Sequence, residues 1–171
     1  MAVTDSFAHR LPIDRIRSGD RFDLAADEQE RTAIARRLGL PSVGRLEAHV
    51  ALERDGVRVR ARGRLKAAVE QSCVATGDPV AAHVDEPFDL LFIPEPADHK
   101  HDDEVELDAG ECDVVFHDGS AIDLGSAIAD TLALALDPYP RSAAADAALK
   151  EAGILSEEQA GPFAALARLK K

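Results

Sequence analysis

Apolar and polar residues alternate through residues 45–73, on both sides of the dipeptide Asp55-Gly56. Such alternation predicts two β-strands with one buried face, and Asp-Gly favours the two-residue turn of a β-hairpin. With this dipeptide as the turn, Leu52 faces Val59 across the hairpin. The residues that then share the buried face are Leu46, Ala48, Val50, Leu52, Val59, Ala61 and Leu65. A slip of one residue would expose this whole set, so the pattern favours one buried face.

The opposite face of the predicted hairpin carries an arginine ladder, formed by Arg58, Arg60, Arg62 and Arg64. The ladder spans roughly 20 Å, a length that can follow several phosphates of a nucleic acid. In the predicted register Arg58 and Arg64 face acidic residues, whereas Arg60 and Arg62 do not. The alternative is a solvated strand face, neutralised by Glu47 and Glu53 or covered by the acidic stretch at 102–113.

Further alternating runs extend the hairpin into a sheet. Residues 7–13 predict a short edge strand, residues 80–92 a third antiparallel strand, and residues 112–116 a brief strand. Pro87 lies inside the third strand, which implies a bulge or an edge position, and Pro94 ends it.

Two stretches show helical periodicity instead. Residues 26–38 begin with acids and end with arginines and Gly39, which are helix start and stop signals. The thin apolar stripe of this stretch predicts a helix on the surface of the sheet. Residues 123–137 form the clearest helix, with Asp123 as its N-cap. Its predicted buried stripe consists of Leu124, Ile128, Leu132 and Leu136.

These elements together predict an α+β fold. A twisted antiparallel sheet of about four to six strands carries the helix at 123–137 on its apolar face. The alternative is a small, partly closed β-barrel with appended helices. We assign residues 1–141 to a single domain and residues 142–171 to a loosely held tail that ends in a short helix.

Charge divides the chain, which has 171 residues and a net charge of −12, into two unlike parts. Residues 1–70 hold 14 Lys and Arg against 11 acids, a net +3, and residues 71–171 hold 6 against 21, a net −15. The acidic total argues against nucleic-acid binding by the whole surface but leaves room for a local basic face. No apolar run approaches the length of a membrane span, and the amino terminus lacks a signal-peptide pattern. We therefore expect a cytoplasmic protein that makes no membrane contact.

The residues that can support catalysis or metal binding lack the necessary spacing. Cys73 has the apolar parity of Val69, which predicts a buried small side chain rather than a nucleophile. The possible zinc ligands are His99, His101, Cys112 and His117. Their spacing matches no zinc pattern, and the acids of 102–113 lack the spacing of a calcium loop. We expect no enzymatic activity, no metal and no cofactor.

Three motifs together point to a family: CVATGDPV at 73–80, IDLGSAIADTLALALDPYPR at 122–141 and PFAALARLKK at 162–171. In this order and spacing they resemble the YceD family, the large ribosomal RNA subunit accumulation proteins of bacteria and plastids. Many members carry Cys-x-x-Cys at the turn, but this chain has Thr76 at the second position, which argues against a metal or redox role for Cys73. The resemblance implies a non-enzymatic cytoplasmic factor for the accumulation of large-subunit ribosomal RNA.

Two functions of different classes fit these observations. The chain is either an assembly factor that touches ribosomal RNA or large-subunit intermediates through the arginine ladder, or an acidic module that binds a basic protein without touching RNA. A ribosomal protein or a processing nuclease would be such a partner. Phe163, Leu166 and Leu169 lie at helical spacing and predict a docking helix for a partner. The alternative is that this helix packs on the domain itself.

Overall fold

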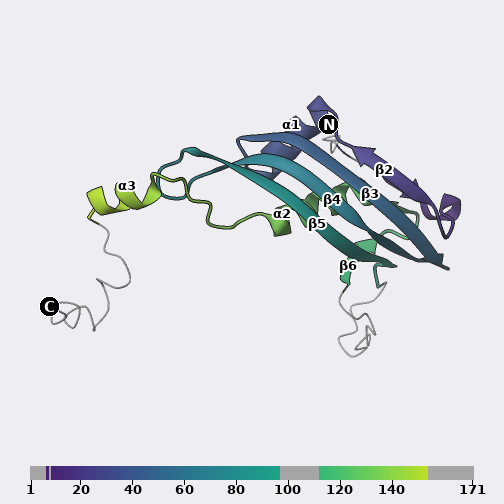
Figure 1. The fold of residues 1–171 in the computed structure, drawn as a ribbon. Helices are drawn as coiled ribbons and strands as arrows, with labels where there is room; N and C mark the ends of the chain where they lie inside the picture. The colour runs from purple at the N-terminus through teal and green to yellow at the C-terminus, as the bar shows by residue number, and fades with distance from the viewer. Residues whose placement is uncertain (1–6, 8, 97–111, 154–171) are drawn as a thin grey trace, which may run out of the picture. The chain divides into compact units, whose positions relative to one another are not determined.

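The computed structural model describes residues 7, 9–96 and 112–153 of the chain. The strands are β1 (Arg10–Pro12), β2 (Arg21–Ala25), β3 (Ser42–Asp55), β4 (Arg58–Ser72), β5 (Pro79–Pro94), β6 (Asp113–His117) and β7 (Ala121–Asp123). The helices are the 3₁₀ helix η1 (Ile13–Arg15), α1 (Glu28–Leu38), α2 (Leu124–Ala135) and α3 (Ala145–Glu151). These elements confirm the predicted α+β class (Figure 1).

The chain divides into two compact units. The sheet unit consists of residues 1–70 and 81–136, and the carboxyl-terminal unit consists of residues 71–80 and 137–171. The end of β4 and the start of β5 therefore belong to the second unit, which also contains α3.

The main sheet is five-stranded and mixed. Its strand order is β2-β3-β4-β5-β6, and a separate two-stranded sheet joins β1 to β7. β6 runs parallel to β5, so the prediction of a purely antiparallel sheet is wrong at this edge. The two strands are separated by residues 95–112, a connection long enough for the crossover that parallel strands need. β2 and β6 are the two edges of the sheet, which is open, so the barrel alternative is also wrong (Figure 1).

The central hairpin has the predicted faces but a different register. Asp55 pairs with Arg58, so the turn residues are Gly56 and Val57 rather than Asp55 and Gly56. Gly56 has a φ of 59°, the positive value that a type II′ turn requires at its first central position. The register moves by two residues, and because side chains alternate with a period of two, the same set remains buried. Leu52 now faces Ala61 and is fully buried.

β5 runs without interruption past Pro87. Among the residues that the structure describes, β6 pairs with β5 only from Leu90 to Pro94, so Pro87 lies where the second side of β5 has no neighbour. A proline that lacks an N–H is tolerated at such a position. β5 is not an edge strand of the sheet, but within the described residues Pro87 lies on a stretch of it that has a neighbour on one side only. β2 was not predicted, because its five residues contain only two large apolar side chains.

Both predicted helices form on the expected residues. Asp27 and Glu30 make a capping box at the start of α1, and Gly39 ends the helix with a φ of 65°. Asp123 caps α2, and the stripe Leu124, Ile128 and Leu132 is fully buried in one cluster with the apolar face of the hairpin. Leu136 packs against this cluster while partly buried. The predicted orientation of α2 is confirmed.

The carboxyl-terminal unit joins the turn after β4 to the segment after α2. Gln71 Nε2 donates to the carbonyl of Asp137 at 2.8 Å, and the Val74 N–H donates to the carbonyl of Pro140 at 2.9 Å. α3 follows this segment and was not predicted, since its alanine-rich sequence lacks large apolar groups. The predicted docking residues Phe163, Leu166 and Leu169 lie outside the described residues.

Candidate nucleic-acid interface

The arginine ladder lies along β4 on the face of the sheet opposite the core, but β5 supplies acids beside it. Arg60 donates through Nε and Nη2 to the two carboxylate oxygens of Asp89, each at 2.7 Å. Arg62 Nε lies 3.3 Å from Asp89 Oδ2, and Arg62 Nη1 lies 3.5 Å from Glu53 Oε1. The prediction that Arg60 and Arg62 lack an acidic partner is therefore wrong. It considered pairs within the hairpin alone, whereas the partners come from β5 and from a hairpin register shifted by two residues.

The ladder continues with a second acid of β5. Arg64 Nε donates to a carboxylate oxygen of Asp85, and Lys66 Nζ lies 4.0 Å from the other oxygen. The order of these ion pairs, with Arg60 beside Asp89 and Arg64 beside Asp85, shows that β4 and β5 run antiparallel. Three members of the ladder are thus neutralised by the sheet itself. A phosphate would have to compete with these carboxylates for the three arginines.

The pKa values at the centre of the ladder follow from this pairing. The hydrogen bonds from Arg60 hold the pKa of Asp89 below its usual range, and the same contact raises the pKa of Arg60. Both groups therefore stay charged at neutral pH. Because the two side chains are about one third exposed, water screens their attraction and the pair contributes modestly to stability.

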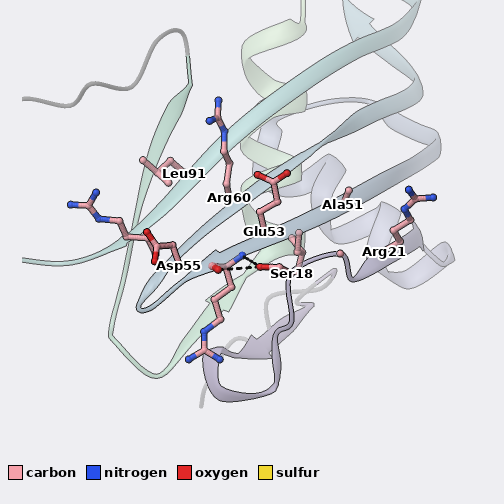
Figure 2. A pocket seen from close by; sticks show the side chains of 11 residues that line it. Ser18, Arg21, Ala51, Glu53, Asp55, Arg60 and Leu91 are labelled. Carbon is pink, nitrogen blue, oxygen red and sulfur yellow. Dashed lines mark hydrogen bonds between the residues drawn. The ribbon is translucent and has the colours of Figure 1, made fainter.

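Arg58 differs from the rest of the ladder. Within the residues that the structure describes, it makes no ion pair, and neither does Arg21 of β2. Both side chains line an open groove of about 850 Å³, which we call the arginine groove. Figure 2 shows this groove, with Arg21 among its labelled residues. Its charged lining consists of four arginines and two acids, namely Arg21, Arg54, Arg58, Arg60, Glu53 and Asp55. The groove therefore has an excess of positive charge in a protein that is acidic as a whole.

Hydrogen bonds between side chains and the backbone hold the wall of the arginine groove in place. Ser18 Oγ accepts a hydrogen bond from the Arg54 N–H at 2.9 Å and lies 3.1 Å from the Arg54 carbonyl (Figure 2). The Arg54 guanidinium donates from Nε to the Gly56 carbonyl at 2.8 Å. Arg54 is thus used to hold the turn. In the part of the chain that the structure describes, Arg21 and Arg58 are the arginines of the groove that make neither an ion pair nor a side-chain hydrogen bond.

Arg21 was missed by the sequence analysis. The run Arg-Phe-Asp-Leu-Ala at 21–25 does alternate, with Phe22 and Leu24 on the inner side, and this pattern is the signal that could have revealed the strand. In the sheet Arg21 pairs with Ala51 of β3. This pairing places its side chain on the same outer face as the ladder.

Cys73 is buried as predicted, but in polar surroundings within the carboxyl-terminal unit. Its Sγ accepts a hydrogen bond from the Ser142 N–H at 3.3 Å. Hydrogen bonds from the Ser142 side chain and backbone, and from the Thr76 side chain, lower the pKa of the Cys73 thiol to about 6. The side chain does not belong to the hydrophobic cluster of the sheet unit.

The residues considered as possible zinc ligands are not brought together in the part of the chain that the structure describes. There, no group of three or more His, Cys, Asp or Glu side chains has the geometry of a metal site. Both ring nitrogens of His117 are engaged, since Nδ1 accepts from the Gly119 N–H and Nε2 contacts the Val57 carbonyl, each at 2.9 Å. His99 and His101 lie outside the described residues.

Among the described helices, none is long and apolar enough to cross a membrane.

Comparison with known proteins gives one match. Residues 61–170 match the family model described as large ribosomal RNA subunit accumulation protein YceD, whereas no curated protein and no solved structure matches the chain. The matched segment contains β5, β6 and α2, and the groove arginines precede it. It covers more than half of the 171 residues and confirms the resemblance found in the sequence. The chain belongs to the YceD family, whose name assigns it a role in the accumulation of large-subunit ribosomal RNA.

Proposed function

We propose that this chain is a non-enzymatic cytoplasmic factor that promotes large-subunit assembly by binding ribosomal RNA or an assembly intermediate at the arginine groove. The observation that carries the proposal is that the groove is lined by Arg21 and Arg58, which make no ion pair with the described residues, in a chain of net charge −12. Phosphate contacts from arginine position a protein on RNA without reading its sequence. A local basic groove therefore permits RNA binding by a protein that would otherwise repel RNA.

Within this groove we assign the phosphate contacts to Arg58 and Arg21. Neither makes an ion pair with the described residues, so neither has to release a carboxylate before it binds a phosphate. Arg60, Arg62 and Arg64 are held by Asp85 and Asp89, so their net field is small. The sequence-based proposal of a four-arginine contact thus narrows to one ladder arginine and one arginine from β2.

The test compares the double variant Arg21→Ala/Arg58→Ala with the wild type in binding a large-subunit ribosomal RNA fragment across a range of salt concentrations. Removal of two phosphate contacts should weaken binding and reduce the slope of log affinity against log salt by about one to two units. Arg64→Ala is the matched control, because it removes an arginine that Asp85 already neutralises. The proposal fails if the wild type does not bind at low salt, or if Arg64→Ala alone lowers affinity and slope as much as the double variant.

A second candidate function is the binding of a basic protein, such as a ribosomal protein or a processing nuclease, by the acidic part of the chain. The observation that favours it is the charge of residues 71–171, which hold 6 basic and 21 acidic residues. Capture of partners from lysate, with and without nuclease treatment, separates the two functions. Partners that remain bound after nuclease treatment support the protein-binding function, whereas partners that are lost support binding through RNA.

A further inference from the structure

The edge of the sheet next to the arginine groove carries an apolar patch on its outer face. Leu90 and Phe92 of β5 are buried in the core, so the alternate residues Leu91 and Ile93 face outward together with Asp89. In the parallel pairing of β5 with β6, Leu91 lies beside Val114 and Ile93 lies beside Phe116. We call Leu91, Ile93, Val114 and Phe116 the outer apolar patch. Phe116 is its most exposed member, with 58% of its surface accessible.

The outer apolar patch is continuous with the arginine groove. Leu91 belongs to both, since it lines the groove together with Arg58 and Arg60. Figure 2 shows Leu91 and Arg60. Two inter-strand spacings separate β4 from β6, a distance of about 10 Å. Phe116 therefore lies within a short reach of Arg58, on the same face of one sheet.

The position of Phe116 is fixed by its neighbour. His117 is buried, and the Gly119 N–H donates to its Nδ1, so Nε2 carries the proton and donates to the Val57 carbonyl at 2.9 Å. Val57 immediately precedes Arg58 in the chain. This hydrogen bond connects the end of β6 to the hairpin turn. The ring of Phe116 and the guanidinium of Arg58 therefore project from two segments that are hydrogen-bonded to each other.

An exposed aromatic ring on a sheet, beside arginines that are available for phosphates, is the arrangement on which unpaired nucleotides stack. The bases of a duplex cover each other's faces, so only an unpaired base can lie on such a ring. We propose that Phe116 is a stacking platform for an unpaired base of RNA whose backbone contacts Arg58, which makes single-stranded RNA the ligand class. The inference rests on the proposed function, because it takes RNA as the ligand of the groove.

The test measures the affinity of the full chain for a single-stranded RNA oligonucleotide and for the same length of RNA duplex. The wild type should bind the single strand more tightly. Phe116→Ala should weaken single-strand binding by about 5- to 150-fold, the range expected for the loss of one stacked base. Its salt slope should remain that of the wild type, because no phosphate contact is lost, whereas Arg58→Ala should lower the slope.

Two controls separate stacking from general apolar contact and from misfolding. Phe116→Leu keeps an apolar side chain without an aromatic face and should bind nearly as weakly as Phe116→Ala. Leu134→Ala removes a side chain of α2 that is 81% exposed and should leave affinity unchanged. All variants should have the melting temperature of the wild type, since the substituted side chains are exposed.

The outcomes distinguish this inference from the proposed function. Equal affinity for duplex and single strand, or unchanged affinity in Phe116→Ala, would overturn the stacking role while the groove variants can still show RNA binding. A Phe116→Ala variant that binds RNA normally but loses a protein partner in nuclease-treated lysate would reassign the patch to a protein. Absence of RNA binding by the wild type would overturn the proposed function, and the stacking role with it.

Discussion

Asp89 of β5 accepts two hydrogen bonds from Arg60 of β4, each of 2.7 Å, one on each carboxylate oxygen. The same carboxylate lies 3.3 Å from Arg62 Nε, so one acid contacts two members of the arginine ladder. Bidentate arginine-carboxylate pairs have a geometry that a phosphate would reproduce. Asp89 therefore occupies the place where an RNA phosphate would bind this part of the ladder.

Substitution of Asp89 by Asn should release Arg60 and Arg62. We expect tighter RNA binding by Asp89→Asn and a salt slope that is steeper by about one unit. The control is Asp14→Asn, which removes the same charge at an exposed residue of η1. Binding titrations at several salt concentrations provide the measurement. An affinity gain no larger than that of Asp14→Asn would show that these two arginines do not contribute to RNA contact.

Leu132→Ala should destabilise the sheet unit by about 2 to 5 kcal/mol, since it removes most of a fully buried side chain from the core stripe of α2. The matched control is Leu134→Ala, the same change two residues later, at a side chain that is 81% exposed. Chemical denaturation of both variants measures the difference. Similar losses in free energy of unfolding would mean that α2 does not present the Leu132 face to the core.

Gly125 should not accept a side chain. A Cβ at this position would lie 1.6 Å from the carbonyl oxygen of Phe7, so Gly125→Ala forces the amino-terminal segment away from α2. We expect a loss of at least about 1 to 3 kcal/mol in the free energy of unfolding. Gly44→Ala is the control, because the nearest atom to its added Cβ is 3.6 Å away. If the two variants unfold at the same denaturant concentration, the close approach of Phe7 to α2 is not present in solution.

The lowered pKa of Cys73 predicts a pH dependence of stability. The thiol has a pKa of about 6 in the folded chain against an ordinary value of 9.0, so the folded state favours the thiolate. This stabilisation is complete above pH about 9 and is lost as the pH falls through about 6. The melting temperature of the wild type relative to Cys73→Ser should therefore rise between these pH values. Cys112→Ser should follow the wild type, and parallel curves for Cys73→Ser would contradict the assigned hydrogen bonds.

Truncation after Gly161 tests the proposed docking helix. Loss of Phe163, Leu166 and Leu169 should leave the melting temperature unchanged and reduce the accumulation of large-subunit ribosomal RNA in cells. The triple change of these residues to Ala in the full chain should have the same effect. A drop of many degrees in the melting temperature would instead show that this segment packs on the rest of the chain.

The sequence predicts well which side chains of an element are buried, but it predicts poorly which residues lie opposite each other in the sheet. The difference has a physical reason. The buried set of the hairpin survives a register error of two residues, because alternation has a period of two and is indifferent to which partner lies opposite. The α2 stripe, the N-cap Asp123 and the stop signal Gly39 are local features and were predicted directly. Asp27 was placed inside the first helix, whereas the structure makes it the N-cap. Local signals determine these elements, so no knowledge of the sheet order was needed.

The candidate site was less predictable because it depends on strands that are distant in sequence. Asp89 neutralises Arg60 only because β5 lies beside β4, and Arg21 reaches the groove only because β2 adds to the far edge of β3. The parallel pairing of β6 likewise decides that Phe116 faces outward beside Ile93. The hydrophobic periodicity of a single segment does not indicate which strands become its neighbours in the sheet.

The pairing of β1 with β7 affects how the chain folds during its synthesis. Arg10 pairs with Asp123, and the Leu124 N–H donates to the His9 carbonyl, so partners are separated by more than 110 residues. At the usual rate of about 5 to 20 residues per second, the ribosome needs roughly 6 to 23 s to add this length of chain. During that interval β1 has no partner strand, while β2, β3 and β4 can already pair. The two-stranded sheet is therefore expected to form after β2, β3 and β4 have paired, and a nascent chain arrested before Ala121 would leave β1 without its partner strand.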